Sequence, residues 1–162
     1  MSPAAYPMPM QEGVRSLLSD LLGQGIDVQR AARPDYEPDE IVVVADYVND
    51  SGDVATAIVV DHEFACFAGA ALAMMPVGAA RDNIRRAVLP DNVRENVHEV
   101  LNVAAQLMQM TGSPHVRLRT VTVLPGELPP ETDALVSRPT SRRDFVVDVE
   151  GYGSGRMSVL ST

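Results

Sequence analysis

The sequence predicts an α+β domain in which a mainly antiparallel sheet carries two long helices on one face. Segments rich in β-branched residues occur in pairs, and turn-forming residues separate the members of each pair. Such pairs are typical of antiparallel hairpins. Further segments, two of them long, place apolar residues at helical spacing. Because helices and strands follow one another with mostly hairpin connections, we expect the α+β class.

The N-terminal ten residues contain three prolines and are expected to form a flexible leader, with residues 11–162 as a single domain. Helical spacing of apolar residues then predicts a helix over Val14–Leu22, which two glycines end. We expect a strand over Ile26–Ala32 to follow.

A hairpin and a buried helix are predicted next. The β-branched segments Ile41–Val48 and Val54–Val60 are separated by residues 49–53, which are turn formers. Asp61 is suited to cap the alanine- and methionine-rich helix that follows, and Met75 precedes the proline that ends it.

A long amphipathic helix is predicted over Asp91–Thr111, with Pro90 and Asp91 as its start signal. At about 100° per residue, one face is apolar: Val93, Val97, Val100, Leu101, Ala104 and Met108. The opposite face is a narrow polar stripe: Glu95, Glu99, Asn102, Gln106 and Gln109. Asn102 is a poor helix former in the middle of this helix, where a bland surface would carry Lys, Arg, Glu or Ala.

The C-terminal part of the chain is predicted to return to strands. Residues 116–124 alternate, which would put one set on a common face: Val116, Leu118, Thr120, Thr122 and Leu124. Residues 125–144 resemble a loop, with a short strand over Ala134–Val136. Phe145–Val149 and Arg156–Leu160 are expected to form a final hairpin around a glycine-rich turn.

Composition excludes several classes of function. The chain has 162 residues, 46% of them hydrophobic, and a net charge of −9. That charge opposes binding to nucleic acid or to an anionic membrane. No apolar run of about 18 residues is present and the N-terminus lacks a signal-peptide pattern, so we expect a cytoplasmic protein. The single Cys66 is expected to be a small buried hydrophobe.

No metal site is predicted. His98 and Glu99 resemble the start of a zinc-protease helix, but the position of the second histidine holds Asn102. His62 and His115 lie at no ligand spacing. The glycines between 151 and 155 are followed by no lysine and by too few residues for a phosphate-binding helix, which favours a hairpin turn.

Glu99, Asn102 and Pro125 form the pattern Glu-x-x-Asn followed after 22 residues by Pro. In this pattern and in the order of its elements, the chain resembles the CheC/CheX phosphatases of bacterial chemotaxis from about Gln11 to its end. It carries a single Glu-x-x-Asn, as in the CheX type.

The resemblance implies hydrolysis of the phospho-aspartate of a CheY-like response regulator. Asn102 would align the attacking water, and Glu99 would pair with a lysine of the regulator. Glu95 and Gln106, on the same stripe, would contribute to partner binding. The resemblance implies Mg²⁺ in the regulator and no cofactor in this chain. It also implies a homodimer as one assembly, for which the open sheet edges offer a route.

The chain departs from the family pattern at Glu95, where the family prefers Asp or Ser. This departure keeps a second hypothesis open. The chain would then be a non-catalytic module of the same fold that binds a response regulator or a flagellar switch component. An unrelated α+β domain with a coincidental motif is the third alternative.

Overall fold

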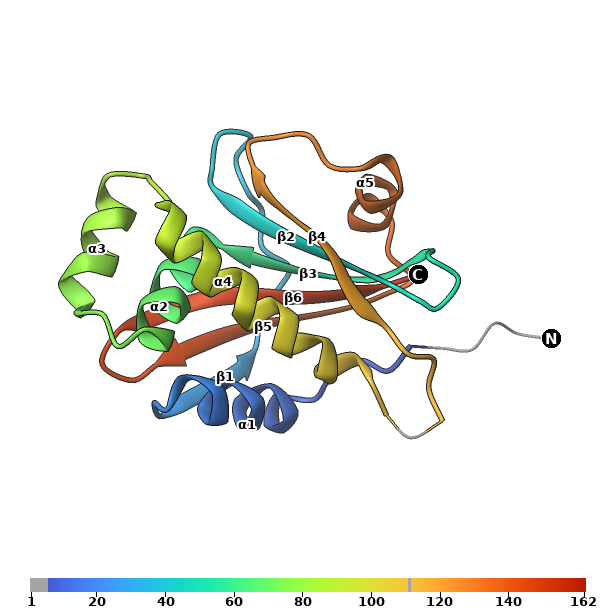
Figure 1. The fold of residues 1–162 in the computed structure, drawn as a ribbon, viewed down its shortest axis with the longest axis horizontal. Coiled ribbons are helices and arrows are strands. Elements are labelled where there is room, and N and C mark those ends of the chain that lie inside the picture. The colour runs from blue at the N-terminus through green and yellow to red at the C-terminus, as the bar shows by residue number, and fades with distance from the viewer. Residues whose placement is uncertain (1–5, 111) are drawn as a thin grey trace.

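The computed structural model describes residues 6–110 and 112–162 (Figure 1). Helices and strands alternate irregularly along the chain. In order they are α1 (Gln11–Leu22), β1 (Ile26–Arg30), β2 (Val42–Val48), β3 (Val54–Asp61), α2 (His62–Leu72), α3 (Val77–Arg85), α4 (Asp91–Val103), the 3₁₀ helix η1 (Ala104–Met108), β4 (Arg117–Leu124), α5 (Pro130–Ser137), β5 (Ser141–Val149) and β6 (Gly153–Ser161).

The six strands form one sheet in the order β1-β5-β6-β3-β2-β4, and every neighbouring pair is antiparallel. The predicted α+β class is therefore confirmed, as are the hairpins β2–β3 and β5–β6. Strands β1 and β4 lie at the two edges of the sheet. Helices α1, α2 and α4 cover one face (Figure 1), and the larger hydrophobic core lies between them and the sheet.

Helix α2 is the buried middle of this helical layer. Its first turn is capped by Asp61, whose carboxylate accepts a hydrogen bond from the backbone N–H of Phe64 at 2.8 Å. From Phe64 to Ala71 every residue is buried, because the helix packs against the sheet on one side and against α4 on the other. A helix that is apolar all round is expected in such a position.

Helix α4 lies very close to α2 at Gly69. A Cβ atom at this position would lie 2.9 Å from Cγ1 of Val93 and 3.2 Å from the Val93 carbonyl oxygen. The Asn96 amide donates a hydrogen bond of 2.9 Å to the Gly69 carbonyl. The whole predicted apolar face of α4 is buried, which confirms the amphipathic pattern. This packing turns the polar stripe away from the core.

Two predicted elements differ in the structure. The α-helical part of the long helix ends at Val103 and continues as η1 to Met108, while the predicted end at Thr111 lies outside the described residues. Pro90, not Asp91, is the N-cap residue of α4, and no side chain caps the helix. The predicted strand Ala134–Val136 is wrong, because these residues belong to α5, where Pro130 and Glu131 provide a helix start signal.

The predicted alternation along β4 is also wrong, because the strand contains a bulge. Asp46 of β2 pairs with Thr120, and the next residue, Tyr47, pairs with Leu118, so Arg119 is an extra residue. Leu118 therefore packs with the larger core, whereas Leu124 packs with a second cluster on the other face of the sheet.

Asp46 stabilises this bulge through hydrogen bonds on the face of the sheet opposite to the larger core. It is 1% exposed and accepts hydrogen bonds from Arg119 Nε at 2.9 Å and from the Thr132 hydroxyl of α5 at 2.7 Å. Burial alone would raise the pKa of Asp46, but hydrogen bonds from Arg119, Thr120 and Thr132 outweigh it and hold this pKa below its ordinary value. Asp46 thus joins α5 to the β2–β4 pair, and Leu135 of α5 packs on the same face.

The described part of the N-terminal segment packs against the domain. Pro9 is buried, and Tyr6 and Met8 pack on the larger core. Arg143 donates a hydrogen bond of 3.1 Å to the Pro9 carbonyl. The rest of the predicted leader, residues 1–5, lies outside the described residues. Among the residues that the structure describes, no helix is long and apolar enough to cross a membrane.

Replacing Gly69 by alanine is expected to destabilise the protein by about 1 to 3 kcal/mol, because the new methyl group would overlap Val93. The matched control is Gly13→Ala in α1, where nothing lies within 4 Å of the new Cβ. Helix propensity alone should stabilise that variant by up to about 1 kcal/mol. Urea unfolding measures both, and equal shifts in the same direction would contradict the close approach of α4 to α2.

Asp61→Asn is expected to stabilise the protein above pH 7 and to lose this advantage below about pH 4. Burial raises the pKa of Asp61 from 3.8 to about 6 in the folded protein, although backbone hydrogen bonds from Arg156 and Phe64 oppose the shift. The stability that protonated Asp61 contributes is therefore fully present below about pH 4 and is lost as the pH rises through 6. An asparagine retains the capping oxygen without the buried charge, so its gain is at most about 3 kcal/mol. Urea unfolding of both proteins at pH 4 and pH 8 tests this, and a gap that does not change with pH would refute it.

Candidate functional site

The exposed stripe of α4 carries the predicted site residues. Glu95, Glu99 and Asn102 are exposed on α4, and Gln106 is exposed on η1. Glu99 and Asn102 are three residues apart, which puts their Cβ atoms about 5 to 6 Å from each other on neighbouring turns. The structure therefore presents a carboxylate and a carboxamide side by side on a helix whose opposite face is fully buried.

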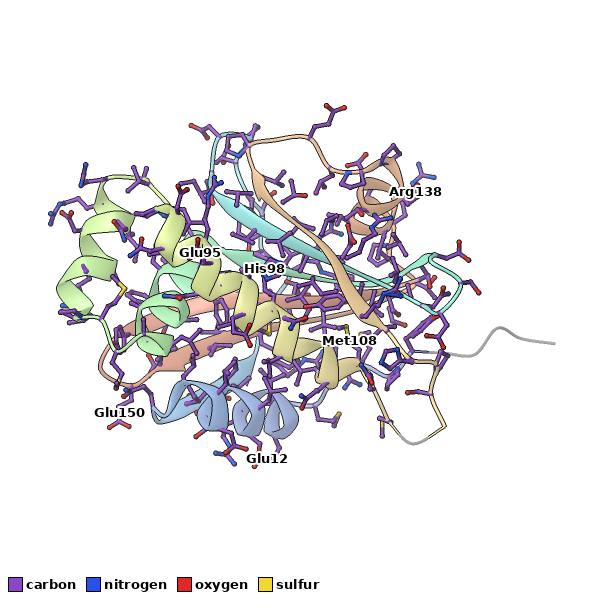
Figure 2. The ribbon with its side chains drawn as sticks, in the orientation of Figure 1. Glu12, Glu95, His98, Met108, Arg138 and Glu150 are labelled. Atoms are coloured by element: carbon purple, nitrogen blue, oxygen red, sulfur yellow. The ribbon has the colours of Figure 1, made fainter. Side chains whose placement is uncertain are left out.

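Glu95 lies at a shallow hollow of about 400 Å³ between α4 and the edge strand β4. Arg94 and His98 line the same hollow, with Val121 and Val123 as its apolar floor. Figure 2 labels Glu95 and His98 in succession along α4. One end of the stripe is thus a mixed-charge groove with an apolar base, and an open strand edge lies beside it.

Gln106 lies at the other end of the stripe, beside a second hollow of about 700 Å³ between α1 and η1. Its lining is mainly apolar and includes Leu17, Leu107 and the exposed Met10 and Met110. The stripe therefore runs from a mixed-charge groove to a methionine-rich one.

Pro125 matches the sequence pattern and lies directly after the end of β4. It follows β4 through a cis peptide bond with Leu124, and Leu124 pairs with Val42. Leu118, in contrast, pairs with Tyr47, whose hydroxyl reaches the residue before Asn102. The six steps along β4 from Leu118 to Leu124 span about 20 Å. Pro125 thus lies toward the Glu95 end of the stripe.

Sequence reasoning missed Tyr47. It is completely buried in β2, and its hydroxyl donates a hydrogen bond of 2.5 Å to the Leu101 carbonyl. The signal in the sequence was a tyrosine inside an otherwise apolar strand, because the hydroxyl of a buried tyrosine usually needs a partner. The neighbouring Asp46 gave a similar signal, since a buried acid in a strand requires hydrogen bonds.

Other predicted features have ordinary structural roles. Cys66 is buried, and burial raises the pKa of its thiol to about 12. Of the glycines predicted to form the turn between β5 and β6, Gly151 lies in the turn, whereas Gly153 and Gly155 belong to β6 and pair with Val149 and Val147. Within residues 6–110 and 112–162, no three His, Cys, Asp or Glu side chains gather closely enough to hold a metal ion.

Comparison with solved structures identifies the fold as that of CheX and CheC-like proteins, which the FliM middle domain shares. No protein-family model and no curated protein sequence matches the chain. The structural likeness is nevertheless extensive, because each match covers about nine tenths of the chain.

Three of these structures are representative. The CheX–CheY–BeF3–Mg²⁺ complex from Borrelia burgdorferi matches with a TM-score of 0.56 at 14% identity, over 90% of this chain and 90% of that chain. FliY from Thermotoga maritima matches with a TM-score of 0.53 at 18% identity, over 91% and 82%. The FliG–FliM complex from H. pylori matches with a TM-score of 0.59 at 8% identity, over 94% and 86%. At these identities the likeness concerns the fold.

Proposed function

We propose that this protein hydrolyses the phospho-aspartate of a CheY-like response regulator, which docks on the exposed stripe of α4. The single observation that carries the proposal is the pair formed by Glu99 and Asn102. These side chains lie exposed on neighbouring turns of a helix that is buried on its other face, in a protein with the CheX fold.

Asn102 has the chemistry that this reaction needs. Hydrolysis of an acyl phosphate requires a water molecule held in line behind phosphorus, and little covalent work remains for the protein. The carboxamide oxygen accepts a hydrogen bond from the water and the carboxamide nitrogen donates one, so the side chain fixes the orientation of the water without taking its proton. The water oxygen bonds to phosphorus, the bond to the aspartate oxygen breaks, and inorganic phosphate leaves. A neutral amide adds no negative charge against the phosphoryl oxygens.

Glu99 is proposed to dock the regulator and not to react. Its carboxylate, one turn from Asn102, would pair with a lysine beside the phosphorylated aspartate and so set the register of the helix on the regulator. The Mg²⁺ that neutralises the phosphoryl charge would be held in the acidic pocket of the regulator. Glu95 and Gln106 would extend the contact to both ends of the stripe.

Asn102→Ala is expected to reduce the accelerated decay of the phosphorylated regulator by about 100-fold, because the attacking water loses its alignment. The decay of a radiolabelled CheY-like regulator from the same genome measures this. The fold should remain intact, since replacing an exposed helical asparagine by alanine changes stability by less than about 1 kcal/mol.

The matched control is Asn92→Ala, which changes an exposed asparagine in the first turn of the same helix, about 15 Å along the helix axis from Asn102. It should retain the wild-type rate. Melting curves of both variants separate loss of chemistry from loss of fold. If Asn102→Ala retained the full rate, the role of its amide in catalysis would be refuted.

Glu99→Gln is expected to raise the concentration of regulator that gives half the maximal rate by about tenfold, which corresponds to ~1.4 kcal/mol of lost charge pairing. The rate at saturation should fall far less than in Asn102→Ala, because Asn102 remains in place. A titration of the decay rate against regulator concentration separates the two parameters. An effect on the saturated rate alone would assign Glu99 to the chemical step instead of docking.

A second candidate function is binding without turnover, and Glu95 is the observation that favours it. This exposed carboxylate lies one turn before Glu99, where it adds bulk and negative charge to the docking stripe. The chain shares its fold with the FliM middle domain as well as with CheX. Binding to a regulator charged with beryllofluoride and Mg²⁺, together with an unchanged decay of the phosphorylated form, would support this candidate.

A further inference from the structure

The Tyr47 hydroxyl makes a long-range contact to the backbone of the motif helix. Tyr47 lies in β2 with no exposed surface, and its ring is part of the larger core. The hydroxyl donates to the carbonyl oxygen of Leu101, 54 residues away, at 2.5 Å. Leu101 immediately precedes Asn102, so this hydrogen bond fixes the backbone beside the proposed catalytic amide.

The contact falls where α4 changes its geometry. The N–H of Ala104 bonds to the Val100 carbonyl as in an α-helix, and the 3₁₀ helix η1 begins at Ala104 itself. Carbonyl groups at the end of an α-helical segment need partners from outside the regular pattern. The Tyr47 hydroxyl is such a partner. Burial raises the pKa of Tyr47 far above its ordinary value, so the hydroxyl keeps its proton and remains a donor.

Tyr47 is itself held in place from the other face of the sheet. The preceding residue, Asp46, points to the opposite face, because successive strand residues alternate. There it accepts hydrogen bonds from Arg119 and from Thr132 of α5. The bulge at Arg119 lies directly beside this pair of residues. A buried ionic contact on one face thus fixes the strand that presents Tyr47 to α4 on the other.

We propose that Tyr47 is a positioning residue for Asn102. Its hydroxyl sets the depth and rotation of the last α-helical turn, and thereby the direction of the carboxamide on the exposed side. This inference rests on the function proposed above. Misplacement of a reacting group by about 1 Å costs up to about 100-fold in rate, so even a small shift of this turn is expected to be measurable.

Tyr47→Phe tests the proposal, because it removes the hydroxyl and leaves the ring. We expect the rate at saturating regulator to fall by about tenfold, within the range for a small misplacement. The half-saturating concentration should change less than about twofold, because the exposed docking carboxylates are retained. In the ¹⁵N–¹H spectrum, the side-chain amide signals of Asn102 should shift.

Tyr152→Phe is the matched control. The Tyr152 hydroxyl also donates to a backbone carbonyl, that of Met75, at 2.5 Å, but it contacts no part of α4 through this bond. Its loss should lower stability comparably and leave turnover and the Asn102 signals unchanged. Rates are expressed per folded molecule from melting curves, so that partial unfolding does not count as lost turnover.

The outcomes separate this proposal from the proposed function. If the wild type accelerates decay and Asn102→Ala does not, the function stands, and a Tyr47→Phe rate equal to that of Tyr152→Phe overturns the positioning role. If the wild type does not accelerate decay, the proposed function fails. The Asn102 amide signals then decide whether Tyr47 positions this side chain: a shift specific to Tyr47→Phe supports it, and unchanged signals overturn it.

Discussion

The close packing of α4 on α2 is the constraint on which the rest of the structure depends. Helix α2 occupies the middle of the protein, so α4 reaches the core only by lying against it. Gly69 permits this approach because it has no side chain, and the Asn96 side chain of α4 donates a hydrogen bond to the Gly69 carbonyl of α2. A helix buried this completely on one side has its rotation fixed, because turning it would expose valines and bury glutamates. The outward direction of Glu99 and Asn102 is therefore a consequence of core packing.

A second constraint acts through the sheet, from the face opposite to α4. Asp46 is a buried carboxylate whose cost of burial is offset by the guanidinium of Arg119 and by threonine hydroxyls. Such a contact is satisfied in a single strand register only, and here that register includes the bulge at Arg119. Because Tyr47 is the next residue of β2, the same register fixes its position on the face that α4 covers. Two neighbouring residues of β2 thus connect α5 on one side of the sheet with the end of α4 on the other.

Those parts of the fold that follow from hydrophobic periodicity could be predicted from the sequence. The buried face of α4, the cap at Asp61 and both hairpins depend on local patterns that recur within a few residues. The bulge at Arg119 could not be predicted, because it is set by the ionic contact with Asp46, 73 residues away. The predicted strand around Leu135 was wrong for a different reason. A short apolar segment fits the two-residue period of a strand as well as the 3.6-residue period of a helix, and here Pro130 is the signal that favours a helix. The exposure of the motif pair was predictable, whereas the support of Asn102 by Tyr47 is tertiary.

Charge along the stripe changes in a direction that suits the proposed reaction. Glu95 and Glu99 are the anionic members of the stripe and precede Asn102 along α4. Asn102 and Gln106, toward the negative end, are neutral. A phosphoryl group near Asn102 would meet amides there, and the Tyr47 hydroxyl has already engaged one of the carbonyls that make this end negative. The chain has a net charge of −9, which repels a phosphoryl group. On the stripe this repulsion is weakest at the neutral end formed by Asn102 and Gln106.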